Sequence, residues 1–102
     1  MATLHTVNKS PFERNSLDTC VKHLAAGDTL LMIEDAVIGA RKGSSMAALV
    51  ETALKSGTVC VLGGDLAARG ISPEDMVPGM QVVDYGGFVD LVAGTDRTVA
   101  WL

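Results

Sequence analysis

Short apolar runs alternate with amphipathic stretches along the whole chain of 102 residues. Runs of β-branched and other apolar side chains predict five short strands, at residues 3–7, 28–33, 58–62, 80–83 and 98–102. The second and third of these runs are almost continuously apolar rather than alternating. Continuous apolar runs are typical of central parallel strands that are covered on both faces.

Helical periodicity lies between the predicted strands. The first helix is expected to begin at Asn15 or Ser16, either of which is a good N-cap, and to be closed by Gly27. Its apolar stripe has the i, i+3, i+4, i+7 spacing of a helix that faces a core: Leu17, Cys20, Val21 and Leu24. A second helix is expected from a cap at Ser44 or Ser45 to a stop at Gly57. Shorter helical segments are predicted at residues 36–40, 65–69, 72–75 and 85–93.

This alternation of strands and helices predicts a parallel sheet with helices on both faces. Right-handed crossovers narrow the fold class to α/β, a flavodoxin-like three-layer sandwich with a mainly parallel five-stranded sheet. The length predicts a single domain, residues 1–102. Hydrophobic residues make up 48% of the chain and charged residues only 20%, which is more apolar surface than a small domain hides easily. We therefore expect part of that surface to cover a subunit interface.

The charge pattern excludes several classes of partner. The net charge is −4 and the lysines and arginines are scattered, so we expect no direct binding of nucleic acid. The longest uncharged apolar run, Thr29–Ile33, is too short to span a membrane, and no membrane association is expected. Met1–Ser10 lacks the features of a signal peptide. These observations predict a cytoplasmic protein.

The cysteines and histidines show no metal-ligand spacing, so no metal is expected. In the cytoplasm Cys20 and Cys60 should stay reduced. Cys60 lies inside an apolar strand and is expected to be inert core, and His5 in the first strand is expected to be structural. The carboxylates of Asp18, Glu34 and Asp65 form no recognisable acid–base pair.

Polar clusters follow four of the predicted strands, where the topology gathers them at one edge of the sheet. They are Asn8-Lys9-Ser10, Glu34-Asp35, Gly63-Gly64-Asp65 and Asp84-Tyr85-Gly86. Open α/β sheets bind ligands at this edge, and here its rim is mostly negative. Neither GxGxxG nor GxxxxGK is present and Gly63-Gly64 alone is a weak signal, so no flavin, nucleotide or other cofactor is expected.

Cys20 has two interpretations that spacing leaves open. As the second member of an apolar stripe it is a buried core residue, because free cysteine is among the most buried residue types. Alternatively it is a partly exposed thiol near the start of a helix, with Lys22 and His23 as nearby cations that favour the thiolate.

Several segments, in order from end to end, resemble the DsrH/TusB family of the DsrE-like superfamily, and most closely DsrH. They are LHTVNKSPFERNSLDTC at 4–20, LLMIEDAV at 30–37, VLGGDLAARGI at 61–71, VVDYGGFVDLV at 82–92 and the terminal AWL. The resemblance implies a flavodoxin-like fold. It also implies the smallest subunit of a three-protein sulfur-relay complex, DsrEFH or TusBCD, in which a DsrE/TusD-like and a DsrF/TusC-like subunit complete a heterohexamer. That complex passes sulfane sulfur as cysteine persulfide to a DsrC/TusE-like carrier, in sulfur oxidation or in tRNA 2-thiouridine synthesis.

The resemblance also bears on Cys20. DsrH-type members carry a cysteine at this position whereas TusB types typically lack it, which favours Cys20 as a persulfide site in a sulfurtransferase subunit. The principal sulfur-carrying cysteine of the family lies on the DsrE or TusD subunit, however. The alternative is therefore a non-catalytic scaffold that completes the complex and its carrier-docking surface. Exposure of the Cys20 sulfur distinguishes these two predictions.

Overall fold

The computed structural model describes residues 2–101 and contains one sheet within them. Its strands are β1 (Thr3–Val7), β2 (Thr29–Met32), β3 (Thr58–Leu62), β4 (Gln81–Val83) and β5 (Arg97–Trp101). The α-helices are α1 (Ser16–Lys22), α2 (Ala47–Ser56), α3 (Gly63–Ala68) and α4 (Tyr85–Gly94), and two 3₁₀ helices are η1 (Glu34–Ala40) and η2 (Pro73–Asp75). All neighbouring strands pair in parallel. The predicted fold class is confirmed. No helix within the described part of the chain has the length and apolar character that crossing a membrane requires.

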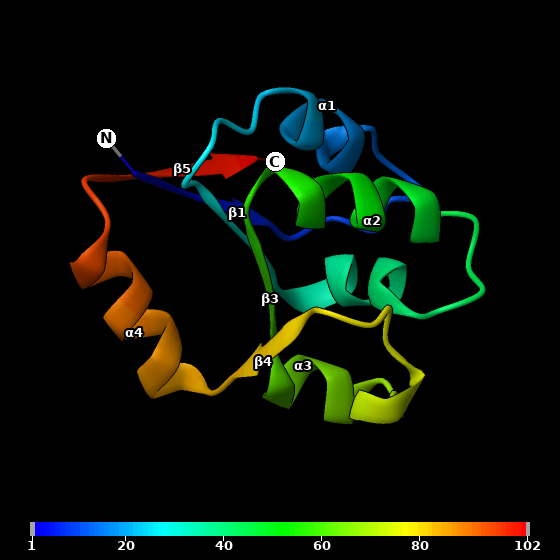
Figure 1. Cartoon of the computed structure of the whole chain (residues 1–102). Helices are drawn as coiled ribbons and strands as arrows, with labels where there is room; N and C mark the ends of the chain where they lie inside the picture. The colour runs from blue at the N-terminus through cyan, green and yellow to red at the C-terminus, as the bar shows by residue number, and fades with distance from the viewer. Residues whose placement is uncertain (1, 102) are drawn as a thin grey trace.

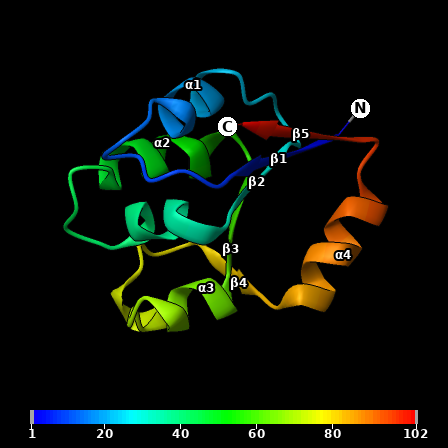
Figure 2. The same ribbon diagram turned by 180° about the vertical axis from the view of Figure 1, so that it is seen from behind.

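The strand order β4-β3-β2-β1-β5 decides where the helices lie. The chain moves stepwise across the sheet from β1 to β4 and then returns to the far side of β1. Since parallel crossovers are right-handed, the first three connections cover one face and the last connection must cover the other. Figure 1 and the reverse view in Figure 2 show α1, α2, η1 and α3 on one side of the sheet, and α4 on the opposite side.

The two faces are therefore packed unequally. On the face covered by three crossovers, buried side chains from all the covering helices form one large apolar cluster, which includes Leu17, Leu30, Val50, Val61 and Leu66. On the α4 face the buried apolar cluster consists of Leu4, Leu31 and Cys60, with partly buried Ile33, Val83, Phe88 and Leu91 against them. No residue of α4 is fully buried. One side of the sheet is thus thinly covered in the protomer.

Several helix ends differ from the sequence-based expectation, and η1 and α3 each begin two residues earlier than predicted, at Glu34 and Gly63. Helix α1 ends at Lys22 rather than close to Gly27, because the amides of His23 and Leu24 turn back to the carbonyls of Cys20 and Val21. Gly27 instead takes a φ of +88° in the turn before β2, a conformation that glycine adopts without strain. Helix α2 begins at Ala47, after a turn in which the Ser44 hydroxyl accepts a hydrogen bond from the Met46 amide at 3.2 Å. The last residue of the predicted fifth strand, Leu102, lies outside the described residues.

Candidate functional site

Cys20 lies on the face of α1 that packs against the sheet. Its side chain is 0% exposed and belongs to the large apolar cluster, together with Leu17 and Val21. Loss of solvation by burial, reinforced by the negative charge of Asp28, raises the pKa of the Cys20 thiol from 9.0 to about 12. In the protomer this sulfur is a protonated core group that solvent does not reach.

The group that acts on Cys20 is a buried carboxylate at the amino end of β2. Asp28 accepts hydrogen bonds from the Thr3 amide at 3.1 Å, the Ala25 amide at 3.0 Å and His5 Nε2 at 2.9 Å. Burial by itself would raise the pKa of Asp28. The hydrogen bonds from His5, Ala25 and Thr3 outweigh it and lower the pKa of Asp28 below 3.8.

Trp101 fixes the tautomer of His5. The indole Nε1–H of Trp101 lies 3.0 Å from His5 Nδ1, and an indole nitrogen can only donate. His5 Nδ1 is therefore an acceptor, and Nε2 carries the proton that is donated to Asp28. The expectation that His5 is structural agrees with this position, because both ring nitrogens are engaged in a network that joins β1, β2 and β5.

The two cations expected beside Cys20 have partners of their own. Lys22 makes an ion pair with Asp18 at 2.9 Å on the exposed side of α1. His23 Nδ1 donates to the Thr19 carbonyl at 2.7 Å, and its ring centroid lies 5.4 Å from that of Trp101. The charge that reaches the thiol is thus the carboxylate of Asp28 rather than a cation, and it disfavours the thiolate.

The carboxyl edge of the sheet, where the sequence placed the crevice, holds a separate polar group. The Asp65 carboxylate accepts a hydrogen bond from the Glu34 amide at 2.7 Å. Glu34 itself has a φ of +50°, a left-handed conformation that is uncommon for residues other than glycine. Arg69 donates to Asp35 at 2.8 Å, so part of the predicted negative rim is neutralised. The sequence-based interpretation missed Arg69, whose spacing of four residues from Asp65 was the available signal.

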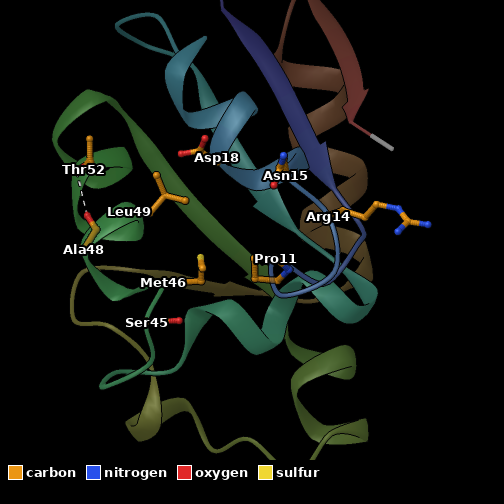
Figure 3. Close-up of a pocket in the computed structure, with 9 residues that line it drawn as sticks. All are labelled: Pro11, Arg14, Asn15, Asp18, Ser45, Met46, Ala48, Leu49 and Thr52. Carbon is orange, nitrogen blue, oxygen red and sulfur yellow. Dashed lines mark hydrogen bonds between the residues drawn. The ribbon is translucent and has the colours of Figure 1, made fainter.

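A surface cavity of about 500 Å³ lies between the loop before α1 and the start of α2. In Figure 3 Pro11, Met46 and Leu49 form its apolar part, while Asp18 of α1 stands at its upper margin. Neither cysteine lines it. The cavity therefore gives no access to Cys20. Among residues 2–101 no three His, Cys, Asp or Glu side chains are grouped as a metal ion would require.

Residues 9–98 match the sequence family described as DsrH like protein. A protein TusB from Erwinia tasmaniensis is 39% identical over 99 residues, which cover 96% of this chain and 99% of that protein. The chain belongs to the DsrH family. Proteins TusB from Pectobacterium parmentieri and Escherichia coli are 32% and 31% identical, and each match covers 96% of this chain and 99% of the relative.

Membership of the DsrH family confirms the resemblance seen in the sequence and supports a place for this chain as a subunit of a sulfur-relay complex. The fold is also found among solved structures of low identity. The ychN protein from E. coli has a TM-score of 0.81 at 17% identity and covers 98% of this chain. A protein of unknown function from Methanobacterium thermoautotrophicum has a TM-score of 0.75 at 18% identity and covers 97% of this chain. These two likenesses concern the fold.

Proposed function

We propose that this chain is a structural subunit of a cytoplasmic sulfur-relay complex, and that it contributes a helix face for assembly rather than a sulfur-carrying thiol. The observation that carries the proposal is a second apolar stripe on α4, pointing away from the sheet. The burial of Cys20 supports the same assignment, because sulfur transfer needs an accessible thiolate.

Helix α4 is apolar on more than one side. Phe88 and Leu91 face the sheet and pack against its small apolar cluster. Tyr85, Val89 and Val92, with the flank of Phe88, form an i, i+3, i+4, i+7 stripe around a shallow depression of about 230 Å³. A helix that is apolar on most sides is typical of a buried helix, and α4 is buried only against the sheet.

The outward stripe is well exposed in the protomer. Tyr85 is 72% exposed, Val89 54% and Val92 44%, and Asp90 is the one charged residue of the helix. Covering such side chains gains about 1–2 kcal/mol for each one. The absence of charge on the stripe and its helical spacing fit an apolar helix of another subunit of the complex.

The alternative is sulfur transfer through Cys20, which stays a prediction from the family resemblance. It would require local opening of α1, because the thiol lies beneath that helix. The DsrE/TusD-like and DsrF/TusC-like partners, the heterohexamer, docking of a DsrC/TusE-like carrier and the choice between tRNA thiolation and sulfur oxidation are likewise proposals that rest on that resemblance.

Assembly with co-expressed DsrE/TusD-like and DsrF/TusC-like subunits tests the structural role. We expect Val92→Asp to abolish co-purification of the complex, since it places a charge in the stripe. Val82→Asp is the matched control, because Val82 is also 44% exposed but lies on β4. Thermal melts of the isolated variants establish that each folds. Retention of the complex by folded Val92→Asp, or its equal loss in both variants, would contradict the proposal.

A further inference from the structure

A second cavity, of about 480 Å³, lies beyond the carboxyl edge of the sheet, where the loop after β1, the segment after η1 and the end of α3 meet. Arg41, Lys42 and Arg69 line it, three of the eight lysines and arginines in the chain. The chain has twelve acidic residues, yet none of those described lines this cavity. The cavity is therefore a positive region on a protein whose net charge is negative.

Two of these cations are unpaired. Within residues 2–101 the side chains of Arg41 and Lys42 have no ion pair or hydrogen bond, and both are exposed. Arg69 differs, because its guanidinium is held by Asp35 at 2.8 Å and by the Asp65 carbonyl at 3.1 Å. Arg69 thus forms a fixed wall, and Arg41 and Lys42 supply the charge available to a ligand.

The backbone that carries Arg41 and Lys42 is tied down. The Lys42 amide donates to the Asp75 carbonyl at 2.7 Å, and the Val77 amide donates to the Ala40 carbonyl at 2.8 Å. Arg41 also forms an isolated antiparallel bridge with Met76. This attachment holds the backbone of the two cations at one place beside the cavity. Less conformational entropy is therefore lost when a ligand binds.

The remaining wall is apolar. Phe12 is 54% exposed at the cavity, and Ile38 and Ile71 line it beneath. An exposed aromatic ring beside unpaired cations suits a ligand that joins an anionic group to a planar group, because the ring can stack and the cations can bind oxyanions. The volume is within the range of small-molecule sites.

We propose that this cavity binds a small organic phosphate with a planar group, of the nucleoside monophosphate class. Arg41 and Lys42 contact the phosphate, and Phe12 contacts the planar part. This site is separate from the α4 stripe and from Cys20, and goes beyond the structural role proposed above.

The three isoleucines of the chain provide a built-in test. Ile38 and Ile71 line the cavity, whereas Ile33 packs on the opposite, α4 face of the sheet. With isoleucine methyl groups labelled in this chain alone, within the assembled complex, AMP should shift the Ile38 and Ile71 signals saturably and leave Ile33 unchanged. Higher salt should weaken binding, because the contact is charged.

Variants assign the contacts. We expect the double variant Arg41→Ala/Lys42→Ala to bind AMP at least tenfold more weakly, and Lys55→Ala, an exposed cation on α2 outside the cavity, to bind it normally. Phe12→Ala should weaken binding of AMP and leave binding of inorganic phosphate unchanged. The proposal is overturned if AMP causes no saturable shift of Ile38 and Ile71, or if the double variant binds as tightly as the wild type. It is equally overturned if an acidic peptide or an RNA oligonucleotide shifts these signals and AMP does not.

Discussion

The surroundings of Cys20 protect its thiol from alkylation, both by raising its pKa and by burying it. A thiol with a pKa of 9.0 is about 10% thiolate at pH 8, whereas one with a pKa of about 12 is about 0.01% thiolate. Only the thiolate is a good nucleophile, so ionisation alone slows alkylation about 1000-fold. Burial adds the further requirement that α1 opens before any reagent arrives. We expect iodoacetamide at pH 8 to leave Cys20 unmodified on the timescale on which an exposed cysteine reacts fully.

The assay is mass spectrometry of alkylated peptides after a time course on the folded chain. The variant Ser45→Cys supplies an exposed thiol on the same molecule, at the surface turn before α2. Cys60, whose pKa is also raised by burial, should be protected like Cys20, and both should react quickly in denaturant. If native Cys20 reacts within about tenfold of the rate of the introduced thiol, the buried position and raised pKa described here are wrong.

Three further predictions concern folding and stability. Asp28 has a lowered pKa in the folded chain, so the ionised carboxylate stabilises the fold above pH 3.8, and this contribution is lost as the pH falls through the lowered value. The difference in melting temperature between wild type and Asp28→Asn should therefore shrink below pH 3.8. Glu34 has a φ of +50°, so Glu34→Gly should change the free energy of unfolding little, whereas the β-branched substitution Glu34→Val should lower it by about 1–2 kcal/mol in urea titrations. A Cβ atom on Gly57 would lie 2.3 Å from the Asp28 carbonyl oxygen, so Gly57→Ala should lower the free energy of unfolding by about 2 kcal/mol or more. The control is Gly64→Ala, because a Cβ atom there would meet nothing within 4 Å. An equal effect of the two substitutions would refute the close approach of Gly57 to Asp28.

Strand positions followed directly from the sequence because β2 and β3 consist of almost unbroken apolar residues. The end of α1 did not follow from the sequence. Gly27 signals a turn that requires glycine, but the sequence does not show whether that turn closes α1 or only precedes β2. The strand order was also not available from periodicity. It is this order that leaves α4 alone on one face of the sheet.

The candidate site was predictable only in part. Periodicity placed Cys20 in the buried stripe, and the structure puts its side chain there at 0% exposed. The influence of Asp28 on that thiol could not be foreseen, because it depends on how the turn before β2 folds back under α1. The cavity beside Arg41 and Lys42 was equally hidden, since it joins segments that are far apart in the chain.

The most direct test of the structural role is intact-mass analysis of the assembled complex after incubation with a persulfide donor. If this chain serves assembly, it should gain no sulfur in either the wild type or Cys20→Ser, while sulfur still reaches the carrier protein at the same rate in both. A gain of one sulfur atom's mass by the wild-type chain that Cys20→Ser abolishes, together with slower sulfur delivery, would contradict the account.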